Sequence, residues 1–598
     1  MDSKTENIRH SLAHLLAIAV LKKFPKAKLG IGPVIENGFY YDFKLPRSLA
    51  PEDLKEFEKT MRELIKARLN FSGKKITAAE AKKAFRDQPF KLDLIKEFTK
   101  DKKGLTIYFT GKTPATIPYS LLTTDYFMDL CRGGHVKNTS EINPEAFALV
   151  KIAGAYWRGD EKNPQLQRIY GLAFETKKEL EDYLHLLEEA EKRDHKKLGV
   201  ALKLFMFHET SPGAPYWLPN GMIIMNQLLD FWREEHAKRE YHEISSPLVN
   251  KKSLWETSGH WDHYKDDMFI ADMGKGEIYG VKPMNCPNAM VVFGSDLRSY
   301  RDLPLRFSDT DSLHRYERSG TLNGLFRARA FRQDDSHNFV TEEQIGEEYE
   351  RIFEIADRFY GIFDLKFRYR LGTRPEKFLG DKKTWDSAEK TLVKILDKHA
   401  GKGKYDVAEK DGAFYGPKVD IIMKDAIGRD WQMGTIQLDF QQPQRFGLKY
   451  TAKDGSAKTP IAIHRVIYGS LERFIGILIE HFAGAFPLWL SPVQAVVLPV
   501  SEKFTNYGKE LFEKIRDNKI RVEIRDTNET LGKRIREAEL QKIPYVLVVG
   551  EKEETNGTVN VRHPSLFKER APGRYLDGEK NIDELIEEMQ EEIKNKAI

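Results

Sequence analysis

Six side chains with strong binding or catalytic chemistry occupy every second position of one short segment: Arg327, Arg329, Phe331, Gln333, Asp335 and His337. A β-strand repeats every two residues, so a strand here would point all six to one face. An earlier strand-like run holds Arg315 and Glu317, and turn-forming residues at 319–324 separate the two runs, which predicts a hairpin with a long loop. A solvated charged face is the alternative, but such a face rarely combines a ring, an amide, a carboxylate and an imidazole with arginines. We therefore favour a functional face.

Cys286, His337 and His464 could share one metal ion, although they lie far apart in the sequence. Cys286 is in the segment MNCP, His337 is in the predicted strand, and His464 lies in the strand-like IAIHRV before a predicted helix. One thiolate and two imidazoles leave the fourth position of a tetrahedral zinc ion open, which is typical of catalytic rather than structural zinc. Spacing alone equally permits three unrelated core residues.

A second set of candidate ligands lies in the N-terminal region. His10 and His14 are four residues apart in a predicted helix, and Cys131 and His135 have the same spacing. Residues four apart on a helix share a face. The histidine pair alone is most simply part of an amphipathic helix. Together, the two pairs indicate a site that binds a metal or positions a water molecule, and we favour the water while leaving the metal open.

The composition is that of a globular protein with several domains. With 598 residues, of which 40% are hydrophobic, the chain should form three or four domains with their own cores. A formal net charge of +5 neither requires nor excludes RNA binding, which would depend on local basic patches. Two cysteines cannot build a disulfide framework. Because the sequence shows neither a signal peptide nor an apolar run of membrane-spanning length, we expect a cytoplasmic protein without a membrane partner.

Changes in sequence character predict four segments. They are an N-terminal domain (1–175), a helical linker (176–198), a central domain (199–490) and a C-terminal domain (491–598). The linker contains the charge-laced amphipathic run KKELEDYLHLLEEAEKRDHKKLG. In the last segment, the buried-strand runs QAVVLPVS, RVEIRD and YVLVVG alternate with helical runs, which predicts an α/β domain.

The segment LHRYERSGTLNGLFRARAFRQDDSHNF resembles motif 2 of the class II aminoacyl-tRNA synthetases, and more closely its threonyl-tRNA synthetase form. FWREEHAKREYHEISSPLV is similar to motif 1 and IHRVIYGSLERF to motif 3, and the resemblance continues in order from about His10 to the C-terminus. It implies a multidomain α+β fold: a class II antiparallel sheet core with helices, an N-terminal α+β editing domain and a C-terminal α/β anticodon-binding domain. The implied partners are threonine, ATP and threonine tRNA, with a homodimer formed through motif 1.

The resemblance also implies roles for individual residues in the central domain. Zn²⁺, one per subunit, would be held by Cys286, His337 and His464 and would take the amino and hydroxyl groups of threonine. Such a metal rejects valine, which a hydrophobic pocket separates from threonine by only about 1 to 3 kcal/mol. Mg²⁺ would accompany ATP. The expected catalytic residues are Arg315, Arg473, His260 and Gln333. The threonine pocket would contain Asp335, Tyr415, Gln437 and Lys418. The expected ATP contacts are Glu317, Arg327, Phe331, Gln432, Thr435 and Ser470.

Serine has the same hydroxyl as threonine, so a zinc site alone would admit it. The N-terminal histidine and cysteine pairs resemble the editing domain shared by threonyl- and alanyl-tRNA synthetases, which implies hydrolysis of mischarged seryl-tRNA. The residues assigned to this site are His10, His14, Cys131, His135 and Asp129. In the C-terminal domain, the positions that match threonine-anticodon readers are Asn528, Glu553 and Arg562.

Several features depart from the family pattern. The chain begins nine residues before His10, so we expect the form without the extra N-terminal small domain. Asn288 and Ala289 replace the Gly-His that usually follows MNCP, and Met433 replaces a frequent cysteine. The alternatives are another class II synthetase, a non-catalytic RNA-binding paralogue and a free-standing metallohydrolase. A non-catalytic paralogue should have lost Arg315 or Arg473, and the chain has both.

Overall fold

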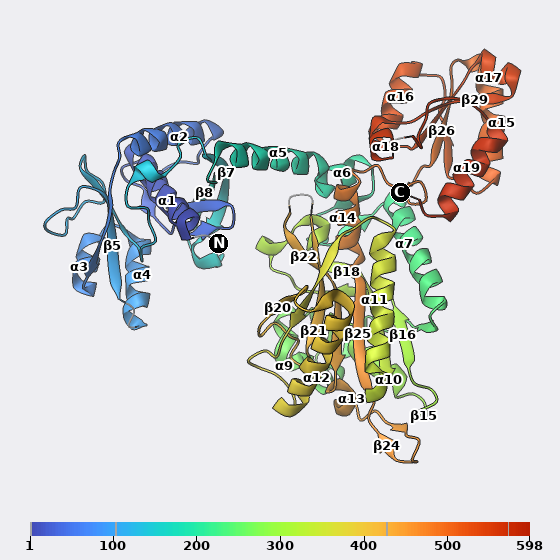
Figure 1. Ribbon diagram of the computed structural model, residues 1–598, viewed down its shortest axis with the longest axis horizontal. Helices are drawn as coiled ribbons and strands as arrows, with labels where there is room; N and C mark the ends of the chain where they lie inside the picture. Colours follow the sequence, from blue (N-terminus) through green and yellow to red (C-terminus); the bar gives the residue numbers. More distant parts are fainter. Residues whose placement is uncertain (1–2, 102–103, 426–427, 572, 598) are drawn as a thin grey trace. The chain divides into compact units, whose positions relative to one another are not determined.

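The computed structural model describes residues 3–101, 104–425, 428–571 and 573–597. They divide into two compact units, one up to residue 188 and one from residue 189 onward. Both helices and sheets are present in each unit (Figure 1), which agrees with the predicted multidomain α+β class. Across the described residues, we find no helix that combines the length and the apolar character needed to span a bilayer.

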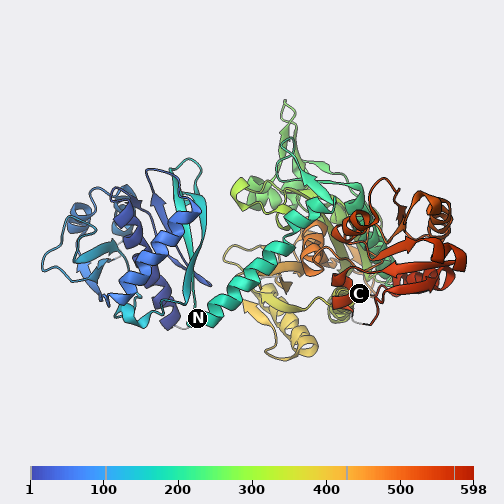
Figure 2. The ribbon, with the colours of Figure 1, turned by 90° about the horizontal axis from the view of Figure 1, so that it is seen from above.

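The first unit contains two antiparallel sheets with helices beside them (Figure 2). The larger sheet has the order β1-β3-β8-β7, with β2 paired to β3. Its strands are β1 (Lys28–Leu29), β2 (Val34–Ile35), β3 (Gly38–Lys44), β7 (Phe147–Tyr156) and β8 (Gln165–Ala173). The smaller sheet consists of β4 (Phe71–Ile76), β5 (Leu105–Gly111) and β6 (Tyr126–Leu130). The helices are α1 (Ser3–Lys23), α2 (Pro51–Lys66), α3 (Ala78–Ala84) and α4 (Pro89–Lys100).

Helix α1 is almost entirely apolar on the side that faces the core, with buried residues from Ile8 to Leu21. His10 and His14 interrupt this apolar stretch, and His14 is itself buried. The predicted spacing therefore does put both imidazoles on α1, at a place where burial demands a partner or a ligand.

The predicted helical linker at 176–198 is two helices rather than one. Helix α5 (Lys177–Arg193) ends before Asp194, and α6 (His195–Ala201) begins after it. Asp194 has a non-helical backbone, and its carboxylate accepts the Lys196 N–H at 2.8 Å as an N-cap. A side chain that caps a new helix in this way separates two helical segments that would otherwise read as one.

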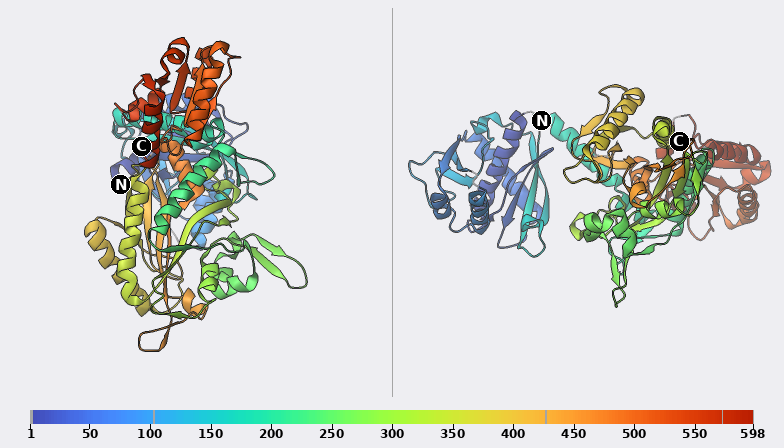
Figure 3. Two further views of the ribbon diagram at one scale, coloured as in Figure 1. Left: turned by 90° about the vertical axis from the view of Figure 1, so that its right-hand side faces the viewer. Right: turned by 90° about the horizontal axis from the view of Figure 1, so that it is seen from below.

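The second unit is built around a nine-stranded sheet of order β11-β16-β18-β25-β22-β21-β19-β20, with β17 paired to β18. Its strands are β11 (Tyr241–Glu243), β16 (Leu305–Asp309), β17 (Ser312–His314), β18 (Ala330–Val340), β19 (Phe367–Gly372), β20 (Asp406–Ala408), β21 (Lys418–Lys424), β22 (Asp430–Asp439) and β25 (Ile461–Ser470). Most pairs of neighbouring strands in this sheet are antiparallel. The long helices run alongside the central strands (Figure 3) and bury an apolar core against one face. They are α7 (Pro219–Ala237), α11 (Ile345–Gly361) and α14 (Leu471–His481).

The hairpin predicted around the 319–324 loop is confirmed, because β17 pairs with β18 in antiparallel register. The strand itself is shorter than expected, since β18 begins at Ala330. Arg329 lies before it, with its backbone N–H donated to the Gly213 carbonyl at 2.7 Å and its Nε to the Glu317 carbonyl at 2.9 Å. The expectation that Arg329 shares the functional strand face is therefore wrong, because the Gly213 and Glu317 carbonyls hold its backbone and its side chain outside the strand.

The C-terminal part contains a five-stranded sheet of order β27-β26-β28-β29-β30, in which β26 is parallel to β27 and β28. The strands are β26 (Ala495–Pro499), β27 (Val522–Ile524), β28 (Tyr545–Val549), β29 (Thr558–Arg562) and β30 (Gly578–Asn581). The helices are α15 (Thr505–Asp517), α16 (Leu531–Leu540), α17 (Glu551–Asn556), α18 (Ser565–Arg570) and α19 (Ile582–Lys594). Every residue of β26 and β28 is buried. This agrees with the predicted alternation of buried strands and helices.

Candidate functional site

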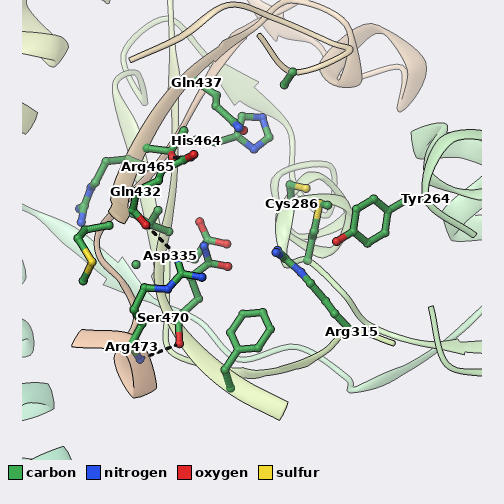
Figure 4. A pocket seen from close by; sticks show the side chains of 18 of the residues that line it. Tyr264, Cys286, Arg315, Asp335, Gln432, Gln437, His464, Arg465, Ser470 and Arg473 are labelled. Carbon is green, nitrogen blue, oxygen red and sulfur yellow. Dashed lines mark hydrogen bonds between the residues drawn. The ribbon is translucent and has the colours of Figure 1, made fainter. Parts of the chain in front are cut away.

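A pocket of about 460 Å³ opens over strands β18, β22 and β25 of the second unit (Figure 4). Fifteen of the predicted site residues line it: Cys286, Arg315, Glu317, Arg327, Phe331, Gln333, Asp335, His337, Tyr415, Gln432, Thr435, Gln437, His464, Ser470 and Arg473. They come from segments that are distant in the sequence. The structure thus brings the predicted metal, threonine and ATP residues to one cavity.

Strand register brings the three candidate metal ligands together. His337 of β18 pairs directly with His464 of β25, and ligand atoms of Cys286, His337 and His464 all lie within 4.8 Å of one another. Both ring nitrogens of His337 are buried without a hydrogen-bond partner among the described residues. Buried polar atoms of this kind require a partner, so the residues present fit a metal ion.

The protonation chemistry of this cluster also suits a cation. Burial lowers the pKa of His337 well below its ordinary value, which leaves a neutral imidazole with a lone pair to offer. Burial raises the pKa of the Cys286 thiol, and a bound cation would reverse that by stabilising the thiolate. His464 Nε2 lies 2.8 Å from Asp439 Oδ2, which orients the ring and leaves its other nitrogen available.

Polar groups that could bind a small amino acid lie beside the cluster. Asp335 Oδ1 is 3.9 Å from His337 Nε2, and its Oδ2 accepts from Asn285 Nδ2 at 3.3 Å. Burial raises the pKa of the Asp335 carboxyl. The Tyr415 hydroxyl donates to Gln437 Oε1 at 2.5 Å. Asp335, Tyr415 and Gln437 therefore place hydrogen-bonding groups on the same cavity wall as the candidate metal ligands.

Arg473 is fixed on the side of the cavity opposite the candidate metal ligands (Figure 4). Its Nε donates to the Phe326 carbonyl at 2.8 Å, and its terminal nitrogen donates to the Gln432 carbonyl at 2.7 Å. Burial, followed by the nearby charge of Arg315, lowers the pKa of Arg473 to about 10. This guanidinium has carbonyl partners but lacks a carboxylate partner among the described residues, so it can stabilise an anion in the pocket.

Arg315 is the second cation of the pocket. Its Nε donates to the Pro283 carbonyl at 3.2 Å, and its guanidinium lies 5.0 Å from the centre of the Phe331 ring. Arg327 pairs with Glu317 at 2.8 Å at the rim. An aromatic ring and several arginines around one cavity suit a ligand that has both a planar ring and phosphates.

Two of the site residues predicted in the central domain do not line the pocket. His260 is fully buried behind its wall, where Nδ1 contacts Ser258 Oγ at 2.8 Å and Nε2 contacts Met284 Sδ at 3.2 Å. Its Nε2 is 4.0 Å from Cys286 Sγ. Lys418 is also buried and pairs with Asp420 at 3.0 Å. In this structure, both residues contact the wall of the cavity rather than the cavity itself.

Asp420 links several predicted residues and was not itself predicted. This fully buried carboxylate accepts from Gln432 Nε2 at 2.8 Å and from Thr435 Oγ1 at 3.1 Å. It also pairs with Lys418 and with Arg370, the latter at 2.9 Å. Asp420 is two positions after Lys418 in β21, and this shared strand parity is the signal that could have identified it.

A second pocket, of about 400 Å³, lies in the first unit. His10, His14 and Cys131 line it, and Cys131 Sγ lies 3.4 Å from His10 Nε2 and 3.2 Å from His135 Nε2. The four predicted residues thus form one cluster with ligand atoms within 4.8 Å of one another. Burial lowers the pKa of His135 to about 2 and raises that of Cys131 to about 12. Neutral side chains of this type can accept a proton, orient water or hold a metal.

The same pocket contains a buried charged group that sequence reasoning missed. Lys91 Nζ lies 2.7 Å from Asp129 Oδ1 and 3.1 Å from the Tyr41 hydroxyl. The Tyr41 hydroxyl donates to Asp129 Oδ2 at 2.5 Å. The predicted Asp129 is therefore one member of a three-residue network that faces the pocket. Lys91 comes from α4 and Tyr41 from β3, so no local spacing points to either of them.

The three predicted anticodon residues do not meet at one point. Asn528 is exposed in the loop after β27, where its side-chain amide donates to Asp526 at 2.8 Å. Glu553 accepts the Gly550 N–H at 2.9 Å at the start of α17. Arg562 is exposed at the far end of β29, opposite Val546 near the start of β28. Asn528 and Glu553 thus follow the carboxyl ends of β27 and β28, whereas Arg562 lies opposite the start of β28.

Comparison with known proteins gives a consistent assignment. Residues 269–482 match the tRNA synthetase class II core domain (G, H, P, S and T), and residues 494–592 match the anticodon binding domain. Residues 105–170 match the threonyl and alanyl tRNA synthetase second additional domain. The threonine–tRNA ligase of Caldanaerobacter subterraneus subsp. tengcongensis is 47% identical over 591 residues, which cover 98% of this chain and 87% of the relative. The chain belongs to the threonine–tRNA ligase family.

Other threonine–tRNA ligases and solved threonyl-tRNA synthetase structures are also similar to this chain. That of Thermotoga neapolitana is 46% identical over 597 residues, covering 99% of this chain and 89% of the relative. The solved RNA binding domain of threonyl-tRNA synthetase from Cryptosporidium parvum is 42% identical, with a TM-score of 0.63, and covers 67% of this chain and 98% of that one. A putative threonyl-tRNA synthetase from Aeropyrum pernix is 28% identical, with a TM-score of 0.58, and covers 68% of this chain and 97% of that one.

The threonine–tRNA ligase assignment also connects the two pockets to separate parts of the family architecture. The larger pocket lies mostly within the class II core match. In the smaller pocket, Asp129 and Cys131 fall inside the second additional domain match, whereas His10 and His14 come from α1, before that match begins. The N-terminal site therefore combines residues from within the 105–170 match with residues from the part of the chain that precedes it.

Proposed function

We propose that this protein activates threonine with ATP to threonyl-adenylate and transfers the threonyl group to threonine tRNA. The observation that best supports this is one cavity that combines the Cys286, His337 and His464 cluster with the buried cation Arg473 and the ring of Phe331. The identities of the substrates come from the family to which the chain belongs. The alternative of a non-catalytic RNA-binding paralogue is not favoured, because the cationic and metal-ligating residues are intact and face the same cavity.

In this proposal, the chain's own residues hold the reacting groups in line. Phe331 stacks on the adenine ring, and Glu317 accepts from its exocyclic amine. Arg315 binds the threonine carboxylate and the ATP α-phosphate, and Arg473 binds the γ-phosphate. Their positive charges stabilise the negative charge that develops at the α-phosphorus. Mg²⁺ accompanies the ATP phosphates.

Cys286, His337 and His464 would hold Zn²⁺, with Asp439 orienting His464 from behind. When bound, the metal would act as a Lewis acid toward the amino and hydroxyl groups of threonine. Asp335 would accept a hydrogen bond from that hydroxyl, and Tyr415 and Gln437 would close the remaining space. Valine would leave these polar groups without a partner, which is costly in a buried site.

Arg473→Ala should reduce threonine-dependent exchange of pyrophosphate into ATP by at least about 10²-fold, because it removes a preorganised charge from the transition state. Arg315→Ala should have a similar effect. Arg351→Ala, which alters an exposed arginine paired with Glu347, serves as the control and should exchange like the wild type. Wild-type exchange in either active-site variant would contradict the proposed roles.

Asp439→Asn should weaken zinc affinity by about 10- to 100-fold, because the amide no longer orients His464 as an anionic acceptor does. The substitution keeps an oxygen for the Gln441 and Gln442 N–H groups that Asp439 Oδ1 accepts. Chelator competition at fixed pH measures the affinity, and Asp430→Asn in an exposed ion pair is the matched control. Equal affinity in all three proteins would show that His464 is not a zinc ligand oriented by Asp439.

We also propose that the N-terminal pocket hydrolyses seryl-tRNA. A metal that selects by the hydroxyl group admits serine, and the loss of one methyl group costs only about 1 to 3 kcal/mol. His10, His14, Cys131 and His135 would orient a water molecule at the ester, and the Lys91 to Asp129 network would bind polar parts of the substrate.

His10→Ala together with His14→Ala should leave threonine activation intact while seryl-tRNA accumulates. Both changes lie in the N-terminal unit and remove groups that face the proposed ester-binding pocket without altering a residue of the larger pocket. Deacylation of preformed seryl-tRNA is the direct assay, with His185→Ala on the exposed side of α5 as the control. If the double variant deacylates seryl-tRNA as fast as the wild type, the N-terminal pocket is not the editing site.

The anticodon roles of Asn528, Glu553 and Arg562 and the homodimer stay predictions that rest on the family resemblance, and the cytoplasmic location stays a prediction from the sequence. The exposed positions of Asn528 and Arg562 are compatible with contacts to unstacked bases.

A further inference from the structure

His195, the first residue of α6, is buried with both ring nitrogens engaged. Nδ1 lies 2.8 Å from Glu480 Oε1, near the end of α14, and Nε2 accepts the Leu325 backbone N–H at 3.1 Å. A backbone amide can only donate and a carboxylate can only accept, so these partners fix a neutral ring with its proton on Nδ1. Asp194, His195 and Glu480 are close enough to bind a metal, but the two ring nitrogens already have partners.

The segment that His195 holds is the end of the motif 2 loop. Leu325 belongs to a short 3-10 turn, η5 (Gly324–Phe326). Gly324 has a φ of +53°, and a Cβ atom there would lie 2.4 Å from His195 Nε2. The Phe326 ring lies 4.2 Å from the His195 ring. Lys196 adds a hydrogen bond to Asn323 at 3.3 Å. The loop end is therefore shaped around this imidazole.

The same turn holds a proposed catalytic arginine. The Phe326 carbonyl accepts Arg473 Nε at 2.8 Å, and the Phe326 ring lies 4.8 Å from that of Trp431, over which the Arg473 guanidinium also sits. Leu325 and Phe326 are both buried. A displacement of η5 would thus move one of the two carbonyls that orient Arg473.

We propose that His195 is a positioning residue for threonine activation: it fixes the end of the motif 2 loop to α6 and α14, and through the Phe326 carbonyl it fixes the direction of the Arg473 guanidinium. This inference rests on the proposed function of the larger pocket. It adds a residue that touches neither the cavity nor any expected substrate. It also makes the segment that follows α5 part of the catalytic apparatus rather than a passive connection.

Three substitutions separate the hydrogen bonds from the volume of the ring. His195→Phe keeps a planar ring, of somewhat larger volume, and removes both hydrogen bonds. His195→Gln can place an amide oxygen near the position of Nε2, and His195→Asn can reach only the Glu480 side. We expect the Phe and Asn variants to lower kcat for threonine-dependent pyrophosphate exchange by about tenfold, with the KM for threonine changed by less than about twofold. The Gln variant should retain most of the activity.

A direct measurement of the loop does not depend on activity. Hydrogen–deuterium exchange in the peptide 319–329 should be faster in His195→Phe and close to wild type in His195→Gln. Leu202→Ala is the matched control, because it removes a buried side chain at the end of α6 that lies outside the larger pocket. It should destabilise the protein without accelerating exchange in this peptide. Unchanged exchange in the Phe variant would overturn the proposal whether or not the wild type activates threonine.

A double-variant cycle tests the route through Arg473. If His195 acts by orienting Arg473, then His195→Phe should cost less than about twofold in an Arg473→Ala background. A full tenfold loss in that background would mean that His195 supports the domain generally, and the positioning role would be rejected. Absence of threonine-dependent exchange in the wild type would instead refute the proposed function itself.

Discussion

The pairing of β25 between β18 and β22 is the constraint on which the larger site depends. It places His464 opposite His337 on one side and opposite Gln437 on the other. A shift of one residue in either pairing would send one of these side chains to the opposite face of the sheet. The apolar core beneath the sheet fixes this register, because the residues on the other face of the same strands are packed against α7, α11 and α14.

Given this register, the chain connections at the ends of the strands position most of the remaining site residues. Strand β25 runs directly into α14, so Ser470 can cap that helix by accepting the Arg473 N–H while the Arg473 side chain turns toward the cavity. The bulge between Gln333 and Asp335 adjusts β18 at the same level. Bulges commonly re-aim side chains next to functional sites. The sheet itself therefore holds His337 and His464, whereas Cys286 at the start of α10 (Cys286–Phe293) and Arg473 in α14 are held at its edges.

The sequence predicted those parts of the site that follow a local period or a recognisable motif. Alternation along β18 indicated the face that carries Phe331, Gln333, Asp335 and His337, and the bulge did not remove any of them from the pocket. The paired histidine and cysteine spacings indicated the N-terminal cluster. The α/β character of the C-terminal part followed from its fully apolar strands.

The parts that were missed depend on partners from distant segments. Lys91 and Tyr41 join Asp129 only through tertiary packing, and His195 gains its significance from Leu325 and Glu480. The break at Asp194 was hidden because both flanking runs have helical composition. Arg329 fits the strand alternation but is captured by the Gly213 carbonyl. Apart from the local N-cap at Asp194, long-range hydrogen bonds or ion pairs decide these outcomes, and spacing along the chain does not encode them.

The two pockets of the proposed function both serve the discrimination of threonine from similar amino acids. A site that recognises a hydroxyl group can reject valine strongly, but it separates threonine from serine by one methyl group. A second pocket in a different unit can remove the error that the first one allows. The proposed function would account for two clusters of cysteine and histidine with different surroundings in one chain: one lies beside arginines and an aromatic ring, the other beside a buried lysine and aspartate.

The most direct test of the central claim is the absorption spectrum of Co²⁺ bound in place of zinc at Cys286, His337 and His464. If these residues hold a metal that recognises the amino acid, the d–d bands should change when threonine or serine is added and should stay unchanged with valine. A control with Cys286→Ser should lose the thiolate charge-transfer band. If the d–d bands do not change when threonine is added, or change equally with valine, the account is contradicted.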